Sequence, residues 1–262
     1  YKNNQIFELA LEKKSDSSLV VVISSSPHRY VSQLSRKFGF VGFGVVILIA
    51  SLFLDKFGYK PFLLLAGVLH IISVIFTSLA ATVYASKVDA DPEAATAAAK
   101  AFLTYGVLLF SVANGICEAV INPLIATIYA KEKTHYLNIL HAGWPAGMIV
   151  GSLLGLGLAG KIAWEIQLGL YIIPTLIYLG MILKEKFPES EAAAAGVSFG
   201  DMVKEFFAPM LAFLLILHAI IGYVELGTDA WISNIMNEAL SGRGLFILLY
   251  TSTLMFILRF FA

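Results

Sequence analysis

Three polar side chains recur at four-residue spacing inside one long apolar stretch: Asn114, Glu118 and Asn122. On a helix they lie within about 80° of one another, so they share one face. A carboxyl group at mid-bilayer costs about 2.5 kcal/mol or more unless it faces a partner or a cavity. The pattern therefore favours a group that loads and releases a proton during transport. A structural carboxyl, hydrogen-bonded between helices, is the alternative interpretation.

Two later segments carry groups suited to binding a small hydroxylated molecule. Asn138 and His141 share a face of the next apolar segment, where His141 can bind a hydroxyl group or exchange a proton with Glu118. A purely interhelical histidine is the alternative. Further along the chain, the rings of Tyr223 and Trp231 can cover the apolar face of a sugar, beside the carboxylate of Glu225.

The alternative for this last group places Glu225 at the water boundary and both rings in the interfacial aromatic belt.

Membrane-spanning helices must position these groups. The 262 residues are 58% hydrophobic and 14% charged, against about 45–50% and about 25% in soluble domains. Lipid is therefore the expected solvent, and a bilayer core of about 30 Å takes roughly 20 apolar residues as helix. The sequence predicts an all-α polytopic membrane protein with about seven transmembrane helices. The predicted spans are residues 38–54, 61–84, 101–129, 136–160, 163–183, 206–226 and 244–261.

Composition and motif searches exclude several other classes of function. The formal net charge is zero, so no global field attracts nucleic acid. The single cysteine, Cys117, excludes an internal disulfide, and the five histidines show no metal-ligand spacing. Motifs for nucleotide binding, zinc proteolysis and serine hydrolysis are missing from the sequence. We therefore expect no enzyme, no metal site and no cofactor other than a coupling proton.

The connectors carry the charges that orient a membrane protein. Basic residues mark the connectors after the first, third and fifth predicted spans, which places those connectors on one side, expected to be cytoplasmic. They are Lys56, Lys60, Lys131, Lys133, Lys184, Lys186 and Lys204. Residues 1–37 are polar and also basic, which disturbs this pattern. Residues 86–100 and 226–243 are expected to be polar connectors on the opposite side.

The turn after the first predicted span resembles the loop signature of the major facilitator superfamily. Asp55, Gly58 and Lys60 match that signature, and Lys56 replaces its arginine. The chain departs from it at Ser51, where the family usually has glycine, and at Tyr59, where it often has arginine. The resemblance implies a conformational latch at Asp55, Gly58 and Lys60, separate from any substrate site. A generic charged loop is the alternative.

The third and fourth predicted spans look like those of the fucose–proton symporter family, a branch of that superfamily. Cys117, Glu118, Asn122 and Pro123 match its acidic helix, and Leu137 with Asn138 matches the start of its next helix. The resemblance implies that Glu118 couples the proton and recognises sugar. It further implies a secondary active transporter that moves a monosaccharide by proton symport and alternating access.

On this alignment the chain carries the family's helices two to eight, a partial major-facilitator fold that looks like a fragment. Residues 1–37 have no family counterpart, 38–184 form the N-terminal half, 185–205 the linker and 206–262 the start of the C-terminal half. The family's acidic residue on helix one has no counterpart. The implied protein is a multi-pass resident of the cytoplasmic (inner or plasma) membrane. It is monomeric when full length, and its partners are the bilayer and a small solute, with no nucleic acid.

Two other functions remain open at this point. A polytopic scaffold or membrane enzyme would use the polar groups for helix association, and a transporter fragment would have no activity. A cleft bordered by Glu118 and Asn138 would favour transport.

The glycines at 143, 147, 151 and 155 form a stripe that predicts a close approach of two helix backbones.

Overall fold

The computed structural model describes residues 40–158, 160–240 and 244–262, without the side chains of 40, 41, 225–231, 233, 234, 237 and 238. The predicted segment 1–37 lies outside the described residues. The described part is helical, with no strand among its residues. Its helices are α3 (Phe40–Phe57), α4 (Tyr59–Lys87), α5 (Pro92–Ile128), α6 (Lys133–Leu158), α7 (Trp164–Gly169), α8 (Ile172–Lys184), α9 (Glu191–Ala194), α10 (Phe199–Glu205), α11 (Pro209–Ala239) and α12 (Gly244–Phe260).

Four helical stretches in the described ranges are long and apolar enough to cross a membrane: α4, α5, α6 and the stretch Trp164–Lys184. A fifth exists if α10 and residues 209–224 of α11, bent by 67°, form one span. The all-α prediction is thus confirmed, and the fold is compatible with a multi-pass membrane protein. The prediction of seven spans is confirmed for four or five segments. The other two predicted spans correspond to α3 and α12, which have 18 and 17 residues and are not among these candidate spans.

Two predicted connectors are largely helical instead. Residues 86–100 were expected to be a polar loop, but α5 begins at Pro92, because Asp91 accepts hydrogen bonds from the N–H groups of Glu93 and Ala94. Proline at the first helical position and the alanines that follow favour the helix there. Likewise, α11 continues to Ala239 through most of the expected connector 226–243. The two segments are polar, but charged and amide residues do not break a helix, so polarity alone does not mark a helix end.

The linker also holds local structure that its sequence explains. Ser198 accepts a hydrogen bond from the Asp201 N–H, and its hydroxyl donates to the Asp201 carboxylate at 2.7 Å, a reciprocal cap that starts α10. The Ser198 hydroxyl and then the Lys204 ammonium hold the pKa of Asp201 below its usual value. Residues 185–205 therefore form a connector with two short capped helices, α9 and α10.

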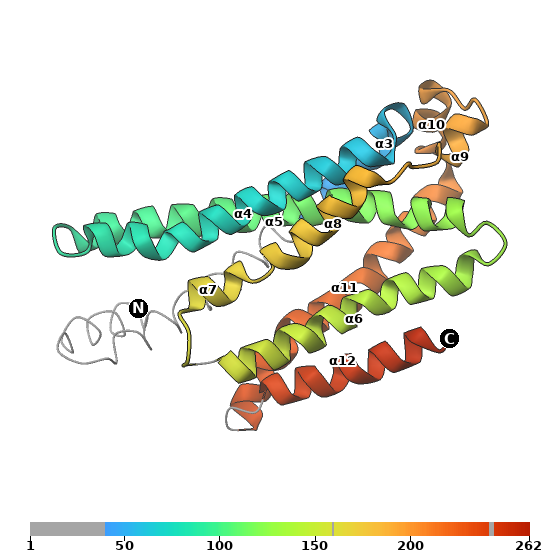
Figure 1. Ribbon diagram of the computed structural model, residues 1–262. Helices are drawn as coiled ribbons and strands as arrows, with labels where there is room; N and C mark the ends of the chain where they lie inside the picture. Colours follow the sequence, from blue (N-terminus) through green and yellow to red (C-terminus); the bar gives the residue numbers. More distant parts are fainter. Residues whose placement is uncertain (1–39, 159, 241–243) are drawn as a thin grey trace.

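The helices form two groups (Figure 1). The helices α4 and α5 make a long antiparallel hairpin, and α3, α7 and α8 pack against it. In the second group, α12 packs along α6 and also contacts α11. In the most apolar stretches of α4 and α5, 39% of the residues are buried, against 17% in α6 and 11% in the stretch Trp164–Lys184. The α4–α5 hairpin is thus the best packed of these spans.

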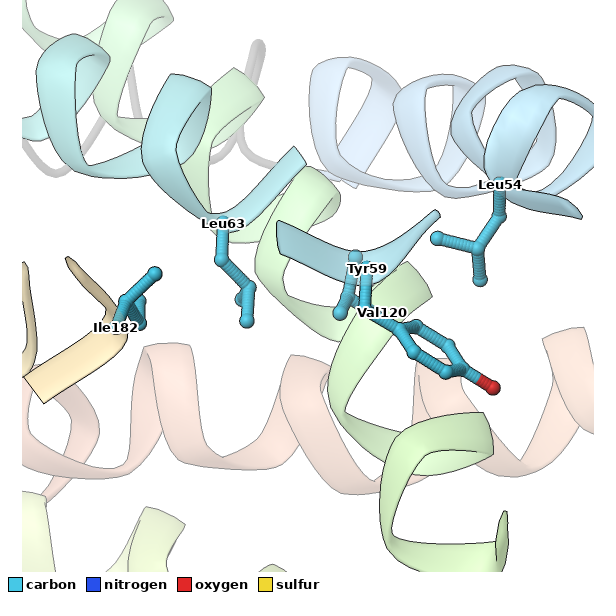
Figure 2. Close-up of a cluster of buried hydrophobic side chains, with 5 residues drawn as sticks. All are labelled: Leu54, Tyr59, Leu63, Val120 and Ile182. Carbon is cyan, nitrogen blue, oxygen red and sulfur yellow. The ribbon is translucent and has the colours of Figure 1, made fainter. Parts of the chain in front are cut away.

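The apolar core of the first group lies where α3, α4, α5 and α8 meet. Figure 2 shows its buried side chains. They are Leu54, Tyr59, Leu63, Val120 and Ile182. The hydroxyl of Tyr59 leaves this core to hydrogen-bond Thr127 Oγ1 at 3.1 Å, so the start of α4 is tied to the end of α5. The core therefore fixes the helix that carries Glu118, which lies two residues before Val120.

Glycines create the close helix crossings of this group, although not the glycines that the sequence predicts. A Cβ on Gly106 of α5 would stand 2.5 Å from Thr77 Cγ2 of α4, and one on Gly115 would stand 2.8 Å from the Phe43 carbonyl oxygen of α3. Gly67 of α4 leaves similar room for Leu179 of α8. These contacts need a hydrogen in place of a side chain.

The predicted close approach at the α6 stripe is wrong for three of its four glycines. The glycines at 143, 147 and 151 are exposed, and no described atom lies within 4 Å of where their Cβ would stand. At the fourth, Gly155, an added Cβ would make only ordinary contact with Leu245 of α12, at 3.8 Å. Four-residue spacing places small residues on one face, but the partner helix packs against a different face of α6.

Candidate functional site

Glu118 and Asn122 form a hydrogen-bonded pair on α5. The Asn122 Nδ2 donates to Glu118 Oε1 at 2.8 Å and contacts the Glu118 carbonyl oxygen at 3.3 Å. Both side chains are half-buried. The Asn122 Oδ1 is buried and has no hydrogen-bond partner among the described residues. The Asn122 amide group thus donates hydrogen bonds to Glu118, and its oxygen can still accept one.

Asn114 shares the helix with this pair, but its side chain is engaged elsewhere. Its Oδ1 lies 3.0 Å from His70 Nε2 of α4, and His70 Nδ1 lies 2.9 Å from the Tyr178 hydroxyl of α8. An amide oxygen only accepts, so His70 Nε2 carries the proton, and in neutral His70 the Nδ1 accepts from Tyr178. The described hydrogen bonds therefore join Asn114 to a contact among three helices rather than to Glu118.

A second polar contact lies next to the first, at the same junction of α4, α5 and α8. The Tyr171 hydroxyl donates to Ser73 Oγ at 2.9 Å, and Ser73 Oγ donates to the Gly106 carbonyl oxygen at 2.7 Å. The Phe110 ring packs edge-on against both His70 and Tyr171. The sequence analysis missed this cluster.

One signal could have identified part of it. Five side chains with hydrogen-bonding capacity lie in two apolar segments at helical spacing: His70, Ser73 and Thr77 on α4, and Tyr171 with Tyr178 around α8. Polar groups at that spacing inside apolar helices predict interhelical hydrogen bonds. Spacing does not indicate which helices are in contact, so the hydrogen-bond partners of His70 could not be predicted from the sequence.

The two residues predicted on α6 lie half-buried, a few turns after the α5–α6 turn. Asn138 and His141 share this helix with Pro145, which is fully buried. The carbonyl oxygen of His141 accepts a hydrogen bond from Arg259 Nη1 of α12 at 3.3 Å. The backbone of His141 thus contacts α12.

The residues predicted on the C-terminal side all fall on α11. Tyr223 is 76% exposed, so its ring lies on the outer surface of this helix. The side chains of Glu225 and Trp231 lie outside the described residues. The described side chains thus do not bring the C-terminal set together with Glu118.

The predicted latch is a tight turn with a helix-capping lysine. Gly58 takes the left-handed conformation, with φ 78°, that lets α4 start directly after α3. Lys60 Nζ donates to the carbonyl oxygens of Leu183 and Glu185, both at 3.0 Å, at the C-terminus of α8. A cation at this position satisfies carbonyls that the helix leaves without partners. Asp55 is half-buried in the last turn of α3.

The three basic connectors lie at the same end of the molecule (Figure 1). Besides the Lys60 contacts, Lys133 pairs with Glu191 of α9 at 2.6 Å, and the ring of Phe53 on α3 stacks on Phe199 of α10 at 5.9 Å. The linker is therefore attached to the ends of α3, α6 and α8. This arrangement agrees with the expectation that these connectors share one side.

A hollow of about 450 Å³ lies at the α5–α6 turn and is lined by residues 131–136. None of the predicted site residues lines it. Within the described part of the chain, no group of three His, Cys, Asp or Glu side chains is arranged to hold a metal ion.

Taken together, the described helices are compatible with an integral multi-pass membrane protein of helical class. No protein-family model, curated protein or solved structure matches the chain.

Proposed function

We propose that the chain is part of a secondary active transporter that moves a small hydroxylated solute, with a monosaccharide as the favoured class, by proton symport. The major-facilitator resemblance of the Asp55–Lys60 turn and of the Glu118 helix motivates the class. In this proposal the protein works in the cytoplasmic membrane, as a monomer when full length. The end that carries Lys60 and Lys133 faces the cytoplasm, because basic connectors are retained there.

The Glu118–Asn122 pair is the observation that carries the proposal. A protonated carboxyl group donates one hydrogen bond and still accepts another, so it can pair with both atoms of an amide. A buried acceptor without a partner costs about 1–3 kcal/mol, and Asn122 Oδ1 is such an acceptor. Protonation of Glu118 would supply the missing donor. The pair therefore favours a bound proton, and movement of Asn122 away from Glu118 would favour its release.

The remaining residues receive roles from their positions. Asn138 and His141 of α6 provide polar contacts for the solute on the N-terminal side. Tyr223, Glu225 and Trp231 of α11 are the proposed contacts on the C-terminal side, reached when the two halves rock together. The turn of Asp55, Gly58 and Lys60 acts as the latch, through the Lys60 contact with the end of α8.

One observation favours a second function, a scaffold without transport. The Asn114 side chain is hydrogen-bonded to His70, and His70 in turn to Tyr178, which is how polar groups associate membrane helices. In that case Glu118 and Asn122 would serve packing alone, and Glu118 would not exchange protons with water. For the transporter we accordingly give Asn114 a positioning role on α5.

Proton-coupled uptake tests the proposal directly. The purified full-length protein that contains this chain is reconstituted in liposomes that contain a pH-sensitive dye, and L-fucose is added outside as the probe. We expect acidification of the lumen that depends on L-fucose, and we expect Glu118→Gln to abolish it. Glu132→Gln is the matched control, because Glu132 is exposed in the α5–α6 turn.

Two outcomes would contradict the proposal at different points. Full acidification by Glu118→Gln would remove Glu118 from the coupling role while leaving transport in place. A folded full-length wild-type protein that gives no response to L-fucose or to a panel of other monosaccharides would overturn sugar–proton symport and favour the scaffold.

A further inference from the structure

Pro145 leaves one backbone carbonyl of α6 without its normal donor. Each carbonyl oxygen in a helix accepts from the N–H four residues later, and proline has no N–H. The carbonyl four residues before Pro145 belongs to His141. The helix nevertheless continues through Pro145 to Leu158, and Pro145 is fully buried. In an apolar environment such a carbonyl needs another donor.

Arg259 of α12 supplies a donor at this point. Its Nη1 donates to the His141 carbonyl oxygen at 3.3 Å, and the Arg259 side chain is half-buried. Arg259 is the cation of the last turn of an otherwise apolar helix. An arginine in such a helix is costly unless it pairs with a polar group, and backbone carbonyls are among its usual partners. Each group thus satisfies the requirement of the other.

The contact lies at one end of a long antiparallel pairing. Leu245, near the start of α12, lies opposite Gly155 near the end of α6, where a Cβ on Gly155 would be 3.8 Å from its Cδ2, whereas Arg259 meets His141. The same number of residues separates the two contacts on each helix, so α6 and α12 stay in register between them. Sliding α12 by a residue would move the guanidinium about 1.5 Å along α6, away from the freed carbonyl.

We propose that Arg259 is a positioning residue that locks α12 to α6 by replacing the backbone donor that Pro145 lacks. The lock fixes the register of the helix pair and stabilises the proline-interrupted part of α6. It is independent of any transported solute. Because this hydrogen bond joins the two helices at a proline, its loss would make it easier for α12 to shift and for α6 to bend at the same point.

A double-mutant cycle in the reconstituted chain tests this coupling. Arg259→Met keeps an unbranched apolar stem and removes the donor, and we expect it to lower Tm by about 2–4 °C, the effect of one hydrogen bond in a chain of this size. Pro145→Ala restores an N–H for the His141 carbonyl. In that background we expect Arg259→Met to leave Tm unchanged, and we expect Arg259→Lys to recover part of the loss in the wild-type background.

The control and a second measurement keep the test decisive. Leu258→Met changes a neighbouring side chain that is 71% exposed, and we expect no shift in Tm. In case a variant is too unstable to compare, the ¹³C resonance of the His141 carbonyl reports the bond in the folded state. It is observed in a chain labelled only with histidine that carries ¹³C at its carbonyl carbon, and it is assigned by its loss in His141→Asn. Arg259→Met should shift it upfield.

Equal effects of Arg259→Met with and without Pro145 would overturn the proposal, because the arginine would then not act through the freed carbonyl. A His141 carbonyl resonance that is unchanged by Arg259→Met would overturn it as well.

Discussion

The helices of the two groups are held together by different kinds of contact. Around α4 and α5, glycines bring helices into direct contact, and polar side chains pair across them, as His70 does with Asn114 and Tyr178. Around α6 and α12, the described glycines at 143, 147 and 151 are exposed, and Ser252 Oγ is buried without a hydrogen-bond partner among the described residues. An arginine–carbonyl hydrogen bond connects the two helices near Pro145.

This difference indicates that the α4–α5 group is the more rigid one and that the α6–α12 group can move more easily. A helix group with close crossings and several interhelical hydrogen bonds resists deformation, because any shift breaks several contacts at once. A group held by fewer polar contacts has a smaller barrier to sliding. Glu118 lies on α5, the helix of the rigid group that runs toward the α6 group. An alternating-access protein would need such a fixed proton site beside a movable partner.

The largest expected effect concerns the close crossings. Gly106→Ala should lower the free energy of unfolding by about 1–3 kcal/mol, because the new Cβ would overlap Thr77 of α4. Gly147→Ala on α6 should stabilise the chain by up to about 1 kcal/mol, the difference in helix propensity, since no described atom is near. Unfolding of both variants in lipid nanodiscs measures this, and similar values for the two would show that the groups are packed alike.

The hydrogen bonds of the His70 cluster come next. Tyr178→Phe leaves His70 Nδ1 without its donor inside the core, so we expect a loss of about 1–2 kcal/mol. Tyr171→Phe is the matched control on the same side of the bundle. It should cost less, because Ser73 still donates to the Gly106 carbonyl oxygen. Thermal unfolding of both variants checks the order, and a reversed order would contradict the importance of His70.

A smaller effect is expected at the latch turn. Lys60→Met removes two donors from the C-terminus of α8 and should lower stability by about 0.3–1 kcal/mol. Hydrogen exchange at the amides of residues 183–186 should rise in this variant. Lys56→Met is the control, because Lys56 is exposed and lies over the Phe57 ring. Equal exchange in both variants would exclude capping by Lys60.

The smallest effect belongs to the ion pair between Lys133 and Glu191, which attaches the linker to α6. Both side chains are partly exposed, so a double-mutant cycle with Lys133→Ala and Glu191→Ala should give a coupling of about 0.2–1 kcal/mol. The coupling should fade at high salt, because exposed charges are screened. A coupling that is insensitive to salt would mean that the contact is not electrostatic.

The sequence predicted the parts of the fold that local chemistry determines. Apolar length located the main helices, Gly58 marked the turn between α3 and α4, and charge grouped the connectors. Helix ends were less accurate, since α5 starts at Pro92 through a cap at Asp91 that the polarity of residues 86–100 concealed. Sequence spacing placed Glu118 and Asn122 on one face, and the structure adds their hydrogen bond.

Contacts between segments far apart in the chain could not be predicted from the sequence. The face shared by Asn114 and Glu118 was correct for the helix, yet Asn114 pairs with His70, 44 residues earlier, and not with the carboxyl group. Four-residue glycine spacing on α6 identified a smooth face without indicating whether another helix covers it. In each case a periodic pattern gives the face, and only the packing of other helices gives its partner.

Infrared difference spectroscopy of the reconstituted chain tests the central claim, that Glu118 exchanges a proton with water. As the pH is lowered in D₂O, we expect the C=O band of a protonated carboxyl group to appear and to be lost in Glu118→Gln but retained in Glu132→Gln. A titrating spectrum that is identical in the wild-type and Glu118→Gln chains would contradict the claim and leave Glu118 as a packing residue.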